Sequence, residues 1–140
     1  MAMNIKAYRG QMQWASGLNL LTAIWLFVSA FLIPIHASMK TNNIIVGVVV
    51  AVLAAIRLAG AYNQPWMSWL NAILGLWVMG SPWALMGTGP LGPTAGTIAN
   101  NLITGAVIFM LACWSAAAST TEPVPPATYS GNIRPSYGRE

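Results

Sequence analysis

Four long apolar stretches, separated by short polar breaks, dominate the pattern of hydrophobic and polar positions along this chain. They cover roughly residues 14–33, 44–62, 66–85 and 98–118. Each is close to the ~20 residues that a helix needs to cross about 30 Å of hydrocarbon. The polar face that a helix on the surface of a soluble domain carries is almost absent from them. The pattern therefore predicts an all-α membrane protein with four transmembrane helices.

The chain outside these stretches is polar or rich in turn-forming residues. Glycine and proline concentrate in residues 86–96, which we expect to form a loop. Residues 1–13 are expected to precede the membrane, and residues 120–140 to form a flexible tail, because Pro, Ser, Thr, Gly and Tyr dominate there. A secretory signal is the alternative at the amino terminus, since Lys6 and Arg9 precede an apolar run. The length of that run favours a retained helix.

The two halves of the chain repeat each other, as units of two helices over residues 14–62 and 63–119. In the first helix of each unit, residues recur 52 positions later: Leu18, Asn19, Trp25 and Ser29 as Leu70, Asn71, Trp77 and Ser81. In the second helix, residues recur 58 positions later: Asn42, Asn43 and Gly47 as Asn100, Asn101 and Gly105. Because each unit crosses the membrane twice, both copies face the same way. We therefore expect a pseudo-twofold bundle with its axis along the membrane normal.

Composition supports the membrane prediction, since 56% of the residues are hydrophobic and 6% charged, against about 25% charged in typical soluble domains. The basic residues never form a run interleaved with aromatics, so nucleic acid is not an expected partner. Basic residues cluster on one side of the predicted spans, at Lys6, Arg9, Arg57, Arg134 and Arg139, against Lys40 on the other. This distribution predicts that both termini lie in the cytoplasm.

The residues needed for acid–base or nucleophilic chemistry are scarce. The first carboxylate is Glu122, and the chain has one histidine, His36, and one cysteine, Cys113. We therefore expect no enzyme, no metal site and no cofactor. The same scarcity argues against a proton-coupled transporter, which relies on an acid inside the membrane. His36 is the one candidate ligand for a cofactor, and a single ligand is weak support.

The third stretch ends in Ser81, Pro82 and Trp83. With this tripeptide inside a paired-helix repeat, the chain resembles the SPW repeat proteins of bacteria. The resemblance covers about residues 14–118. That family consists of small membrane proteins whose repeat unit holds two transmembrane helices, with Ser-Pro-Trp in the first. The first copy carries other residues at these positions: Ser29, Ala30 and Phe31. The resemblance implies the four-helix architecture and a place in a bacterial inner membrane, and it brings no established activity.

Pro82 lacks a backbone donor and tends to kink a helix, and Ser81 can bond the backbone group left free. Trp83 then lies where the helix meets the interface. We expect this motif to be a structural helix end, with a hinge or a ligand notch as the alternative. Trp25 and Trp77 lie near mid-bilayer, so we expect core packing, with cofactor stacking as the alternative.

The polar residues within the apolar stretches have structural interpretations too. A buried indole needs an acceptor, and Asn19, Asn71 or Thr22 could supply one to the two mid-bilayer tryptophans. Paired asparagines begin the second helix of each unit, where we expect them to cap free backbone donors: Asn42, Asn43, Asn100 and Asn101. Arg57 is the one charge inside an apolar stretch, and we expect its side chain to reach the lipid headgroups.

The leading functional hypothesis is a structural or accessory membrane subunit. Its expected partners are the bilayer, copies of itself or the subunits of a larger complex, an energy-transducing one among the candidates. The main alternative is a small oligomeric transport or channel protein. A third hypothesis is a pigment, haem or quinone binder that uses His36 with Trp25 and Trp77.

Overall fold

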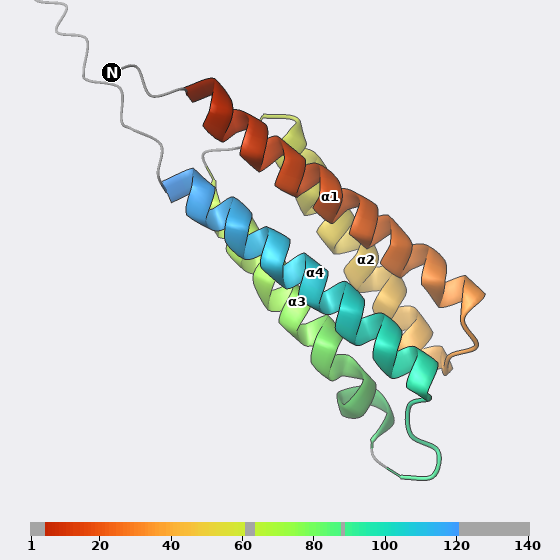
Figure 1. The fold of residues 1–140 in the computed structure, drawn as a ribbon. Helices are drawn as coiled ribbons and strands as arrows, with labels where there is room; N and C mark the ends of the chain where they lie inside the picture. Colours follow the sequence, from red (N-terminus) through yellow and green to blue (C-terminus); the bar gives the residue numbers. More distant parts are fainter. Residues whose placement is uncertain (1–4, 61–63, 88, 121–140) are drawn as a thin grey trace, which may run out of the picture.

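The computed structural model describes residues 5–60, 64–87 and 89–120, and within these ranges all regular structure is helical. The four helices, shown in Figure 1, are α1 (Ile5–Leu32), α2 (Ala37–Leu58), α3 (Pro65–Met86) and α4 (Ala95–Thr120). Each contains a segment long and apolar enough to cross a membrane: Arg9–Leu32, Ala37–Leu58, Pro65–Met86 and Ala95–Ser119. The predicted all-α fold with four membrane spans is confirmed. Residues 121–140 of the predicted tail lie outside the described residues.

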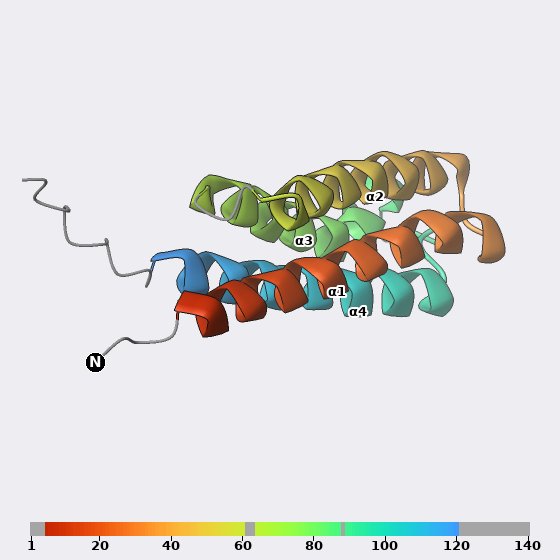
Figure 2. The same ribbon diagram turned by 90° about the horizontal axis from the view of Figure 1, so that it is seen from above.

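The helices form an antiparallel bundle in which each packs closely along two others. Helix α1 packs on α2 and α4, and α3 packs on the same two helices. Figures 1 and 2 show all four running side by side. The α1–α2 turn and the α3–α4 loop lie at one end, which we call the hairpin end. The starts of α1 and α3 and the ends of α2 and α4 lie at the other, the terminal end (Figure 1).

The helices extend beyond the apolar stretches that predict them. Helix α2 begins at Ala37 rather than near residue 44, and α4 begins at Ala95 rather than near residue 98. Apolar side chains show where the hydrocarbon begins. The helix continues beyond that point because its backbone groups need hydrogen-bond partners in the interface as well. At α4 the first free donors are capped by Thr94, whose Oγ1 accepts from the Thr97 N–H at 3.2 Å.

An apolar layer lies in the middle of the bundle, between two polar layers. It consists of Ala23, Leu26, Val46, Val50, Val78 and Ile108, so every helix contributes to it. Toward the hairpin end the buried polar residues include Ser29, Asn43, Ser81 and Asn101. Toward the terminal end they include Ser16, Asn19, Arg57, Ser68, Asn71 and Ser115. Buried polar groups are costly unless they are hydrogen-bonded, so these two layers are where the bundle is most specific.

Glycine allows the helices of each unit to approach closely. A methyl group added at Gly105 would lie 2.6 Å from the Gly75 carbonyl oxygen and 2.8 Å from the Met79 nitrogen. In the first unit the counterpart Gly47 is less confined, with the Ala23 carbonyl oxygen 3.2 Å from such a methyl group. The α3–α4 contact is therefore the tighter of the two.

Candidate functional site: a hydrogen-bonded layer of asparagine and tryptophan

Eight side chains form a hydrogen-bonded layer across the bundle near the hairpin end. We call it the asparagine layer, and each helix supplies two members. They are Trp25 and Ser29 from α1, Asn42 and Asn43 from α2, Trp77 and Ser81 from α3, and Asn100 and Asn101 from α4. The layer brings together residues up to 75 positions apart in the sequence.

A reciprocal pair of amides lies at the centre of this layer. The Asn43 Nδ2 donates to the Asn101 Oδ1 at 3.1 Å, and the Asn101 Nδ2 donates to the Asn43 Oδ1 at 3.0 Å. Both side chains are fully buried. They join α2 and α4, which lie diagonally across the bundle. Away from water such bonds are strong, and an unpaired partner is costly, so the pair holds the diagonal together.

Two tryptophan indoles donate hydrogen bonds to asparagines at the edges of the layer. The Trp25 Nε1 donates to the Asn100 Oδ1 at 3.0 Å, and the Trp77 Nε1 donates to the Asn42 Oδ1 at 2.8 Å. Each bond joins the first helix of one unit to the second helix of the other. The two bonds connect corresponding positions of the repeat, which is the pattern expected of a pseudo-twofold bundle; the axis itself stays a prediction.

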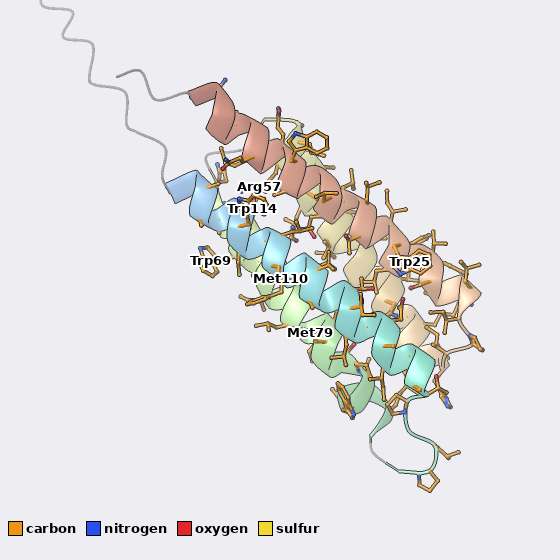
Figure 3. All side chains as sticks on the ribbon, in the orientation of Figure 1. Trp25, Arg57, Trp69, Met79, Met110 and Trp114 are labelled. Atoms are coloured by element: carbon orange, nitrogen blue, oxygen red, sulfur yellow. The ribbon has the colours of Figure 1, made fainter. Side chains whose placement is uncertain are left out.

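The structure corrects two expectations about these residues. The asparagines are not caps, because α2 and α4 begin earlier and place all four in their second turns: Asn42, Asn43, Asn100 and Asn101. Trp25 and Trp77 are not core residues, since their side chains are 50% and 43% exposed on the outside of the bundle (Figure 3 labels Trp25). Their acceptors are the paired asparagines rather than Asn19, Asn71 or Thr22; the Thr22 hydroxyl donates to the Leu18 carbonyl.

The spacing of tryptophan and serine in the sequence could have indicated these hydrogen bonds. Ser29 and Ser81 follow Trp25 and Trp77 by four residues, so serine and tryptophan lie on one face of each helix. The Asn100 Nδ2 donates to the Ser29 Oγ at 3.2 Å, just as its Oδ1 accepts from the indole. The recurrence of the pair Trp-x-x-x-Ser in both units could therefore have indicated a shared acceptor on the facing helix.

In the Ser-Pro-Trp motif, the serine belongs to the asparagine layer and the proline is the next residue of α3. Pro82 lies within α3 and cannot donate to the Val78 carbonyl four residues earlier. The Ser81 Oγ donates to that carbonyl at 2.9 Å and also accepts from the Asn101 Nδ2 at 3.2 Å. One hydroxyl thus satisfies the backbone at the proline and links α3 to α4.

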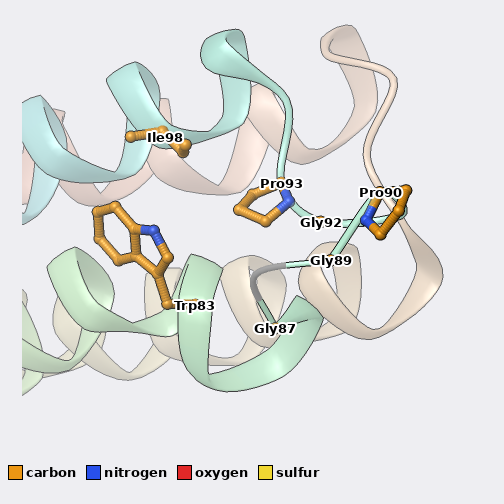
Figure 4. A pocket seen from close by; sticks show the side chains of 7 residues that line it. All are labelled: Trp83, Gly87, Gly89, Pro90, Gly92, Pro93 and Ile98. Carbon is orange, nitrogen blue, oxygen red and sulfur yellow. The ribbon is translucent and has the colours of Figure 1, made fainter.

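Trp83 belongs to a separate feature at the hairpin end. Its ring faces the α3–α4 loop and the first turn of α4 across a cavity of about 270 Å³ (Figure 4). The cavity is lined by Trp83, Gly87, Gly89, Pro90, Gly92, Pro93 and Ile98. The first unit has only a short turn here, so the cavity is a property of the second unit.

The model of the SPW repeat domain family matches residues 13–115 of the chain. The chain belongs to the SPW repeat domain family. The match contains the whole asparagine layer and the Ser-Pro-Trp motif of this SPW repeat protein. No curated protein and no solved structure matches the chain. With four spans, the protein is a multi-pass membrane protein.

Arg57 lies in the polar layer near the terminal end, labelled in Figure 3, and its side chain is 3% exposed. Its Nη1 donates to the Gln64 carbonyl at 2.8 Å, and its Nη2 donates to the Ser115 Oγ at 2.9 Å. The expected contact with lipid headgroups is corrected accordingly. The side chain points across the bundle to α4 instead of along α2 to the interface, because the buried Ser115 hydroxyl accepts from its Nη2.

His36 directly precedes α2, next to a shallow depression that it lines with Pro34, Ile35 and Thr94. In the part of the chain that the structure describes, no group of three His, Cys, Asp or Glu residues could hold a metal ion. Cofactor binding by His36 stays a prediction. Cys113 is half-buried in α4 as a free thiol.

We expect Trp77→Phe to destabilise the bundle by about 1 kcal/mol, because the Asn42 Oδ1 loses its indole donor while the aromatic area is mostly kept. Equilibrium unfolding in mixed micelles measures the change. Trp69→Phe is the matched control, since Trp69 is more than half exposed on the same helix. Equal effects of the two substitutions would show that the indole bond to Asn42 contributes nothing.

Proposed function

We propose that this SPW repeat protein is a structural or accessory subunit of a bacterial inner membrane, which associates with itself or with a larger membrane complex. The asparagine layer is the observation that carries the proposal. Its donors and acceptors are engaged in bonds between the four helices. Polar groups used in this way stabilise one arrangement of the bundle and are not presented to a substrate.

The outside of the bundle supports the same proposal. Large apolar side chains project from all four helices, among them Trp14, Ile45, Trp69, Ile73, Met110 and Trp114 (Figure 3 labels three of these). Helices associate in a bilayer through van der Waals packing, and a surface of this kind can pack on lipid or on a partner's apolar helices. Aromatic residues are also enriched where proteins meet.

The transport alternative has less support within a single copy. The apolar layer of Ala23, Leu26, Val46, Val50, Val78 and Ile108 fills the centre of the bundle. A polar solute would have to cross this layer between the two polar ones. A transport pathway would therefore have to form between copies. The pigment or quinone alternative has less support because the Trp25 and Trp77 indoles already donate to Asn100 and Asn42.

Purification in mild detergent tests the proposal, with an affinity tag after Glu140. We expect the protein to elute as a discrete oligomer or with stoichiometric membrane partners, and an identically tagged unrelated membrane protein is the control. A monomer without partners contradicts the proposal. A lone oligomer that conducts solute in liposomes supports the transport alternative, and visible absorbance supports the third. In the proposed orientation, protease removes the tag from inverted vesicles and not from spheroplasts.

A further inference from the structure

Arg57 carries a positive charge in a bundle that offers it no carboxylate. The only acidic side chains of the chain are Glu122 and Glu140, and both lie beyond the described residues. Within the described part of the chain, its two acceptors are the Gln64 carbonyl and the Ser115 hydroxyl, which are neutral. Buried charges in proteins are normally paired, and inside membranes an ionisable side chain normally has a functional partner.

Further polar atoms near the terminal end lack partners among the described residues. The Arg57 Nε–H and the Ser68 hydroxyl are buried donors that make no hydrogen bond there, and the Oδ1 atoms of Asn19 and Asn71 are buried acceptors that make none. Ser68 and Asn71 are 1% and 2% exposed. An unpaired buried polar group costs about 1–3 kcal/mol, and natural structures contain few of them. The two donors without an acceptor indicate that a ligand able to accept hydrogen bonds belongs near Arg57.

The register of α3 places these groups on the side that Arg57 reaches. Gln64 directly precedes α3, and its carbonyl is within hydrogen-bond distance of the Arg57 guanidinium. Ser68 and Asn71 follow Gln64 by four and seven residues, so all three lie on one face of the helix. Arg57 itself extends past this face to Ser115 on α4. Ser68 therefore lies on the face of α3 that begins at Gln64, the residue that the guanidinium contacts.

We propose that Arg57 and Ser68 bind a small inorganic anion of halide size inside the bundle near the terminal end. The anion accepts from the Arg57 Nε–H and from the Ser68 hydroxyl, and it neutralises the buried charge. A phosphate or carboxylate prefers two parallel guanidinium donors. Both Nη atoms already donate to protein groups, so an acceptor that takes single donors fits better. This site goes beyond the proposed function and does not depend on it.

Thermal unfolding of the purified protein in mild detergent tests the site, with chloride replacing gluconate at constant ionic strength. We expect chloride to raise Tm by about 5 °C in a saturable manner, because a ligand that binds only the folded state stabilises it. Ser68→Ala should weaken the apparent chloride affinity about tenfold, since one donor to the charged ligand is lost. Arg57→Met should abolish the response.

Lys40→Met is the control for general charge effects, because Lys40 lies at the opposite end of the bundle over the Phe31 ring. Its chloride response should equal that of the unmodified protein. If Arg57→Met does not fold, the affinity measured with Ser68→Ala still decides the question. A Tm that is the same in chloride and gluconate overturns the proposal. So does a response that appears only in Glu122→Gln, because the chain's own carboxylate would then occupy the site.

Discussion

Asn43→Leu is expected to destabilise the bundle by about 2 kcal/mol. The substitution removes both bonds of the central amide pair and leaves the Asn101 amide buried with fewer partners. Asn101→Leu should cost a similar amount for the same reason. Unfolding in mixed micelles, followed by circular dichroism as the denaturing detergent is raised, measures both.

The double variant Asn43→Leu with Asn101→Leu distinguishes pairing from packing. Because the second substitution removes a group already left without its partner, the double variant should lose about 1 kcal/mol less than the sum of the single losses. Asn19→Leu is the matched control, as Asn19 is buried with no partner for its Oδ1 among the described residues. It should be neutral or stabilising. Strict additivity at positions 43 and 101 would contradict the role assigned to the pair.

Gly105→Ala is expected to cost about 1–3 kcal/mol, because the new methyl group meets the backbone of α3 and the two helices must separate. Backbone atoms cannot rotate away as a side chain can. The same unfolding measurement applies, and an increase in the distance between spin labels on α3 and α4 would report the separation directly.

Two other glycines provide controls for that substitution. Gly47→Ala, at the corresponding position of the first unit, should cost less, because its new methyl group meets atoms no nearer than 3.2 Å. Gly80→Ala should be neutral or stabilise α3 by about 0.5 kcal/mol, since nothing lies within 4 Å and alanine favours the helix. Equal losses at Gly105 and Gly80 would show that close packing is not the cause.

The four spans could be predicted from the sequence because hydrocarbon imposes one strong requirement, a long apolar helix. The ends of those helices could not. Asn42 and Asn43 directly precede an apolar stretch, so hydropathy alone cannot distinguish polar caps from polar residues inside a longer helix. Only the position of the facing helix decides between the two interpretations.

The surroundings of the Trp25 and Arg57 side chains could not be predicted from hydropathy either. Depth along a helix can be counted in residues, and depth predicts mid-bilayer for Trp25. Whether the side chain points inward or outward depends on rotation of the helix, which the apolar surroundings leave open because every face is hydrophobic. For Arg57 the error has the opposite direction. Its position near a helix end predicts a side chain at the interface, whereas its guanidinium is buried and donates to Ser115.

The cross-unit bonds of the asparagine layer have a consequence for the order in which the chain can mature in the membrane. Trp25 enters with α1, but its acceptor Asn100 is 75 residues further along, on the last helix to be synthesised. Asn43 likewise awaits Asn101. The first hairpin is therefore inserted before the hydrogen-bond partners of Trp25 and Asn43 have been synthesised. The asparagine layer can form only after α4 has been translated.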